Sequence, residues 1–174
     1  MVMYIVSSLL VIAGGITIVF TVMGSSSQLN PGGTGELDIT LAQGAEENGM
    51  AVMLSDMIKT NLTNKPERLK DFNKLKGTIW INATDAEVDM SMAFNRGNLV
   101  VHDGKVGKPI LVIATDSATL LDLANINIKM GMPNYFDETG RMVIKKLLGR
   151  ELKIKGMFAH TMALTHLTKI MSVN

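Results

Sequence analysis

The first 35 residues of the chain contain no charged side chain, and this feature limits what the chain can fold into more than any other. The first charged residue is Glu36, and Met1–Met23 is an almost unbroken apolar run. At a rise of about 1.5 Å per residue, a helix over this run would cover the hydrocarbon core of a bilayer, which is about 30 Å thick. The sequence therefore predicts a single transmembrane anchor at residues 1–23.

Three alternatives to this anchor stay open at the level of sequence. A cleaved signal peptide normally has Lys or Arg ahead of its apolar core, and this chain has neither, although Val22-Met23-Gly24 offers a weak cleavage site. A prepilin-like start would require glutamate where the chain has Phe20. A buried helix of a soluble domain is the third alternative. Because the run has no Lys or Arg beside it, the positive-inside rule leaves its orientation undetermined.

The chain after this run is expected to hold one domain. The stretch GSSSQLNPGGTG at 24–35 is typical of a flexible tether, and we place the linker at 24–45 and the domain at 46–174. A net charge of +1 argues against a nucleic-acid partner. The absence of cysteine excludes disulfides, thiolate metal sites and cysteine nucleophiles.

Hydrophobic spacing predicts the elements of this domain. Apolar residues recur every three or four positions from about Glu46, and Pro66 opens a second helix. After Gly77 the period changes to two, which predicts strands at 79–83, 88–94, 99–101 and 110–114 in a meander. The remaining chain predicts helices at 116–123 and 139–150, a strand at 152–154 and a last helix from Met157, with an irregular segment at 125–137. Grouped strands with helices at both ends favour an α+β fold, a mostly antiparallel five-stranded sheet covered by helices on one face.

No arrangement typical of catalysis is visible. His160 and His166 are six residues apart, so they cannot chelate one metal from one helical face as an i, i+4 pair could. His102 is expected on a strand beside a turn. No serine lies in a nucleophile-elbow motif, and no phosphate loop is present. We therefore expect a domain that is not an enzyme and that needs no metal or cofactor.

Methionine is the most informative residue type, since the chain has 14 methionines and only 5% aromatic residues. Methionine side chains are flexible and polarizable, and they often line surfaces that adapt to varied apolar ligands. Two interpretations follow: an ordinary core in a methionine-rich sequence, or an adaptable hydrophobic cavity that holds a lipid-like ligand.

Two segments, NLVVHDGKVGKPILVIATDSATLLDLANI and LLGRELKIKGMFAHTMALTHL, resemble the sterol carrier protein 2 family. The resemblance lies in the turn His102-Asp103-Gly104-Lys105, the capped helix of Asp116 to Leu123, and the strand between Gly149 and Gly156. It covers roughly residues 46–173. The chain departs from the family in a longer segment at 125–139, in an ending (SVN) that is no peroxisomal signal, and in its membrane anchor.

The resemblance implies a helix-covered sheet around an apolar tunnel for a sterol, fatty acyl chain, phospholipid or isoprenoid. We expect a membrane-tethered domain that binds or transfers such a lipid, in a prokaryotic inner membrane, on a side that the sequence leaves open. The alternative is a non-catalytic scaffold or accessory subunit of a membrane or lipid-modifying complex, with a protein partner or a second copy of the chain. The cavity-lining residues expected are Met50, Met53, Met57, Met90, Met92, Phe94, Leu121, Met157, Met162, Leu164, Leu167 and Met171.

Overall fold

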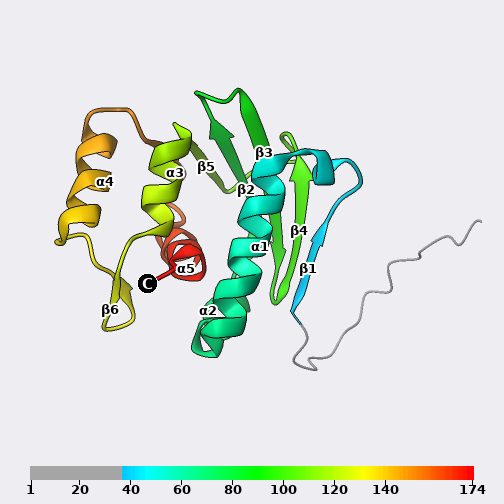
Figure 1. The fold of residues 1–174 in the computed structure, drawn as a ribbon, viewed down its shortest axis with the longest axis horizontal. Helices are drawn as coiled ribbons and strands as arrows, with labels where there is room; N and C mark the ends of the chain where they lie inside the picture. The colour runs from blue at the N-terminus through cyan, green and yellow to red at the C-terminus, as the bar shows by residue number, and fades with distance from the viewer. Residues whose placement is uncertain (1–36) are drawn as a thin grey trace, which may run out of the picture. The chain divides into compact units, whose positions relative to one another are not determined.

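The computed structural model of the protein describes residues 37–174, and its elements follow the expected order with additions at two places (Figure 1). The additions are a strand, β1, at the start and a two-stranded hairpin, β6–β7, in the segment predicted to be irregular. The helices are α1 (Gly49–Asn64), α2 (Leu69–Phe72), α3 (Ser117–Ala124), α4 (Glu138–Leu148) and α5 (Thr161–Met171), with 3-10 turns η1 (Ala45–Glu47) and η2 (Pro66–Arg68). The strands are β1 (Asp38–Leu41), β2 (Lys76–Ala83), β3 (Val88–Asn95), β4 (Asn98–Asp103), β5 (Leu111–Thr115), β6 (Ile128–Lys129), β7 (Met132–Pro133) and β8 (Lys153–Lys155).

The main sheet has six strands in the order β1-β4-β3-β2-β5-β8, so the predicted number of five strands is wrong. Three of the five pairings are antiparallel and two are parallel, so the sheet is mostly antiparallel, as predicted, but mixed. Strands β2, β3 and β4 form the predicted antiparallel meander. The fourth predicted strand does not continue it, because β5 crosses over to pair in parallel with β2. β1 is parallel to β4, and β8 closes the other edge antiparallel to β5. The α+β class is confirmed, with a mixed sheet.

Strand β1 also corrects the predicted linker, which is wrong at its C-terminal end. Asp38–Leu41 pair in register with Asn98–Val101, and Ala45 that follows is fully buried. A four-residue strand gives a weak local signal, because its structure depends on the ladder that β4 supplies. The folded unit therefore begins by residue 38 rather than 46. The other part of the predicted linker, residues 24–35, lies outside the described residues.

One face of the sheet is buried beneath helices, as predicted. Alternate residues of each central strand point to this inner face, including Ile79 and Ile81 of β2, Met90 and Met92 of β3, and Val101 of β4. α1 and α5 lie side by side over this face, and α4 packs against α3 (Figure 1). Period-two burial on one face only is what an antiparallel sheet with one solvated face requires.

Local signals set the helix ends. Asn48 caps α1, since its side chain accepts hydrogen bonds at 3.1 Å from the backbone N–H groups of Met50 and Ala51. Pro66 ends α1, because the residue before a proline is driven out of the helical region, and Lys65 has φ −131° and ψ 71°.

α5 begins at Thr161 and not at Met157, after a turn at Gly156 with φ +85°. A Cβ at Gly156 would lie 2.3 Å from the carbonyl oxygen of Ile110, so only glycine fits there.

Within residues 37–174, no helix has both the length and the apolar character needed to cross a membrane. The anchor that the sequence predicts at residues 1–23 lies outside this described part of the chain.

Candidate functional site

The structure brings eight of the twelve expected lining residues into one apolar cluster and leaves four outside it. Met90, Met92, Phe94, Leu167 and Met171 are buried in the core between the sheet and the helices. Met50, Met57 and Leu164 are partly buried and pack against that core. Met157 is half-buried outside the cluster, and Met53, Leu121 and Met162 are exposed.

This apolar cluster is closed in the structure. Met90 and Met92 have 0% of their surface exposed, and Leu167 has 1%. A side chain that borders an empty cavity keeps surface that a water-sized sphere can reach, and these side chains keep none. The predicted tunnel is therefore filled by the protein's own side chains, and a ligand could enter only if helices or side chains moved.

Helix α5 is fastened over the cluster by polar contacts at its C-terminal half. Asp71 of α2 lies 2.8 Å from Nδ1 of His166 and 2.7 Å from Nζ of Lys169. Asn61 of α1 donates hydrogen bonds to the carbonyl oxygens of Ile170 and Met171, at 3.1 and 2.8 Å. We call the side chains of Asn61, Asp71, His166 and Lys169 the polar clasp. It ties the end of α5 to both α1 and α2.

The carboxyl group of Asp71 is the electrostatic centre of this clasp. Its exposed fraction is 2%, and burial by itself would raise its pKa. The hydrogen bonds from Lys169 and His166, together with the positive charge of Lys169, outweigh burial and hold the pKa of Asp71 below its ordinary value. Asp71 therefore stays ionised and keeps both α5 residues in place.

The polar clasp was not found from sequence. Asp71 lies next to Lys70 in a short, polar helix, so nothing local indicates that its carboxylate faces inward. The sequence also gave His166 no special role. The contacts join residues 95 and 98 positions apart, and only the packing of α5 across α2 brings them together.

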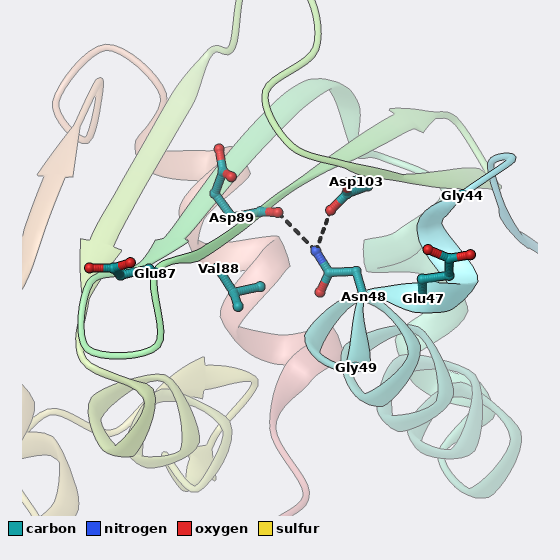
Figure 2. Close-up of a pocket in the computed structure, with 8 residues that line it drawn as sticks. All are labelled: Gly44, Glu47, Asn48, Gly49, Glu87, Val88, Asp89 and Asp103. Atoms are coloured by element: carbon teal, nitrogen blue, oxygen red, sulfur yellow. Dashed lines mark hydrogen bonds between the residues drawn. The ribbon is translucent and has the colours of Figure 1, made fainter.

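Two polar pockets lie away from the apolar cluster, at opposite ends of α1. The first, of about 400 Å³, lies at the start of α1, and its lining residues include the acidic residues Glu47, Glu87, Asp89 and Asp103 (Figure 2). Asn48 reaches across it and donates hydrogen bonds to the backbone oxygen of Asp89 at 3.0 Å and to Asp103 at 2.7 Å. Among the described residues, no group of three acidic or histidine side chains is placed to hold a metal ion. The hydrogen bonds of Asn48 join the start of α1 to β3 and β4, so we assign this pocket a structural role.

The second pocket, of about 330 Å³, lies where α1 ends and has the opposite charge. Lys65, Arg68, Lys70 and Lys169 line it, with the carboxylates of Glu67 and Asp71. Burial lowers the pKa of Arg68 and, together with repulsion from Arg68, that of Lys65. We call this site the cationic pocket.

Comparison with known proteins defines the class of the fold. No protein-family model and no curated protein matches the sequence. Among solved structures, the chain is similar to "UbiJ-SCP2 Ubiquinone synthesis protein", with a TM-score of 0.53 and 11% identity over 73% of this chain and 99% of that one. It is also similar to a structure named sterol carrier protein 2, with a TM-score of 0.42 and 14% identity over 68% of this chain and 92% of that one.

Residues 37–174 therefore have a fold like that of the sterol carrier protein 2 domain. The resemblance seen in the sequence is confirmed at the level of the fold. Similarity of fold by itself identifies neither a ligand nor a membrane contact.

Proposed function

We propose that the described part of the chain is a lipid-binding domain without catalytic activity, and that the apolar chain of a lipid enters between α1, α5 and the inner face of the sheet. The observation that carries this proposal is the group of methionines in and beside the core of a sterol-carrier-like fold. Met90, Met92 and Met171 belong to one continuous core, and Met50 and Met57 pack at its margin. Methionine side chains change rotamer at low cost, so such a core can rearrange around an apolar ligand.

The two halves of α5 suggest where the ligand enters. The buried residues of α5 all lie from His166 onward, in the half held by the polar clasp. The first half is open: Met162 is exposed, while Ala163 and Leu164 are only half-buried. We therefore place the entrance beneath the start of α5, which can move while the clasp holds its end.

The apolar ligand and the uncharged run at residues 1–23 fit the same task. An anchor there would keep the domain close to the bilayer that supplies its ligand, which raises the effective concentration of each for the other. The similar protein named for ubiquinone synthesis makes a quinone with an isoprenoid tail one ligand class to test, beside fatty acyl chains and sterols.

Binding of a fluorescent fatty acid to the purified full chain tests the proposal. We expect saturable binding, and we expect Leu164→Asp to weaken it at least ten-fold, since a carboxylate at the entrance repels and hydrates an apolar chain. Thr165→Asp is the matched control, because Thr165 is the half-buried neighbour of Leu164 but lies outside the core cluster. Equal binding by the two variants, or no saturable binding at all, would contradict the proposal.

The closed core favours one second candidate, an accessory subunit that binds a protein rather than a lipid. Large apolar side chains are exposed on the C-terminal half, including Phe136, Leu148 and Phe158. Such side chains often mark contact sites with a partner. If the purified chain binds no fatty acid, sterol or quinone, while Phe158→Asp abolishes assembly with a partner protein, this candidate replaces the first.

A further inference from the structure

The cationic pocket has a built lining and a surplus of positive charge. Residues from three separate segments form it: η2 and α2, the C-terminal part of α5, and the β6–β7 hairpin, which contributes Ile128 and Gly131. Its cationic side chains, Lys65, Arg68, Lys70 and Lys169, outnumber the two acidic ones, Glu67 and Asp71.

Main-chain oxygens close to the C-terminal end of α5 hold two of the cations of this pocket. Arg68, which is 6% exposed, donates to the main-chain oxygens of Ser172 and Asn174. Lys65 donates to the carbonyl oxygen of Val173 at 2.9 Å. Lys169 and His166 already contact the carboxylate of Asp71. The other acidic side chain that lines the pocket, Glu67, is exposed. A buried guanidinium held by main-chain oxygens stays charged, so an anion in the pocket would be attracted to it.

Lys70 is the cation best placed to meet such an anion. It lines the pocket, it is exposed, and within residues 37–174 its side chain makes no hydrogen bond and no ion pair. An ammonium group on a flexible stem can reach a phosphate as a point charge.

The hairpin beside this pocket presents apolar side chains to solvent. Met130 and Gly131 have φ of +53° and +75°, the paired positive values of a tight two-residue hairpin turn. The turn leaves Met130 97% exposed and Met132 65% exposed, on either side of the pocket residue Gly131. Figure 1 shows this hairpin, labelled β6, projecting near the C-terminal end of the chain. A cationic hollow and an apolar tip thus share one edge of the domain.

From this arrangement we infer that the cationic pocket and the β6–β7 tip form a docking site for a bilayer rich in anionic phospholipid. The phosphate group of one lipid lies in the pocket against Lys70, Arg68 and Lys65, while Met130 and Met132 enter the acyl region beside it. Charge complementarity selects the headgroup, and the exposed methionines distinguish a bilayer from a free phosphate ion. The site is separate from the apolar core, so it stands or fails independently of lipid binding there.

The absence of cysteine from the chain allows a direct test in the full-length protein. Met130→Cys, labelled with an environment-sensitive fluorophore such as NBD, is placed in nanodiscs of phosphatidylcholine or of phosphatidylcholine with phosphatidylglycerol. We expect a blue shift and quenching by spin-labelled lipid in the anionic discs only, with the shift reversed at high salt. Met53→Cys on α1 is the control label, since Met53 is also an exposed methionine and should report water in both discs.

A charge reversal separates docking from simple proximity to the bilayer. Lys70→Glu in the Met130→Cys protein should lower the ratio of docked to undocked domain roughly ten-fold or more, because each cation near an anionic surface contributes about 1 kcal/mol. Lys59→Glu, at an exposed position of α1, is the matched control and should leave the ratio unchanged. Equal emission in the two discs, an equal effect of the two reversals, or a shift produced by inorganic phosphate without any lipid would overturn the inference.

Discussion

The two halves of the described domain differ in how they treat their apolar side chains. Of the 25 buried hydrophobic residues, 18 lie from Ala45 to Leu120, in the segment that runs from η1 through α1, α2 and strands β2–β5 to the first part of α3. Of the 12 large apolar residues that are exposed, 10 lie from Leu121 onward, on α3, α4, α5, the β6–β7 hairpin and the segments that join or follow them. The first half resembles an ordinary protein interior, whereas the second keeps much of its apolar surface in contact with solvent.

The first half therefore provides structural support, and the second half carries the surfaces that can bind a ligand or a bilayer. Tight packing in the first half fixes the backbone of the sheet and α1, which form the floor of the proposed ligand site, while the methionine side chains on this floor can change rotamer. The open start of α5 and the hairpin tip retain apolar area that a lipid or a bilayer could cover. Exposed apolar groups cost stability without a partner, so their concentration in one half favours an interaction role for that half.

The largest expected effect comes from truncating the core of the first half. Phe72 is 1% exposed and packs edge-to-face on Phe94, with ring centroids 6.2 Å apart. Phe72→Ala should lower the free energy of unfolding by about 3–5 kcal/mol, through lost burial and the cavity that remains. Urea unfolding followed by the single tryptophan, Trp80, measures it. A loss below about 1 kcal/mol would show that this half is not tightly packed.

Breaking the polar clasp should have the next largest effect. Asp71→Asn leaves Lys169 and His166 without their carboxylate, and we expect a loss of about 2–3 kcal/mol, less than for a fully buried pair because Lys169 keeps some exposure. Asp56→Asn, at an exposed position of α1, should change stability by less than about 0.5 kcal/mol. Hydrogen exchange should become faster in α5 in the first variant only, and unchanged exchange in α5 would argue against a clasp.

Acidification should reproduce part of this loss. The pKa of Asp71 is lowered by folding, so its contribution is complete above the ordinary aspartate pKa of 3.8 and disappears as the pH falls through the lower folded-state pKa. The wild-type chain should therefore lose more stability than Asp71→Asn between about pH 5 and pH 2. Parallel urea titrations of the two proteins compare these losses, and curves of equal slope against pH would refute the assignment.

The smallest effect is expected at the exposed residues of the second half. Phe158 is 90% exposed, and Phe158→Ala should change the free energy of unfolding by no more than about 0.5 kcal/mol. The same substitution at Phe72 is its counterpart in the first half, so the pair compares one residue type in two environments. A large loss at Phe158 would mean that the second half packs more tightly than its exposed side chains indicate.

Sequence periodicity predicted the elements that depend on local pattern. The strands around Ile79, Met90 and Leu99 alternate because one face of the sheet is buried, and this alternation is visible in the sequence. Strand β1 and the crossover that places β5 beside β2 escaped prediction, since both depend on partners distant along the chain.

The sequence predicted that methionines would lie in the core better than it predicted which methionines these are. The buried arc of α1 runs through Ala51, Leu54 and Ile58, which places Met50 and Met57 at its margin and Met53 beyond it. Apolar spacing identifies the buried side of a helix only approximately, because neighbouring positions share part of a face. For this reason Met53 was expected at the core although it lies beyond the buried arc. Whether the core is open or filled depends on the fit of side chains in three dimensions, and no sequence pattern encodes that.

The most direct test of lipid binding in the core is methyl NMR of the full chain with labelled methionines, held in amphipol and titrated with a fatty acid such as dodecanoate. The proposed function predicts that the methyl signals of Met90 and Met92, which have no exposed surface, shift with saturation while that of Met53 on the surface does not. If only exposed methionines shift, or if none does, the ligand does not enter the core and the account of a lipid-binding domain is wrong.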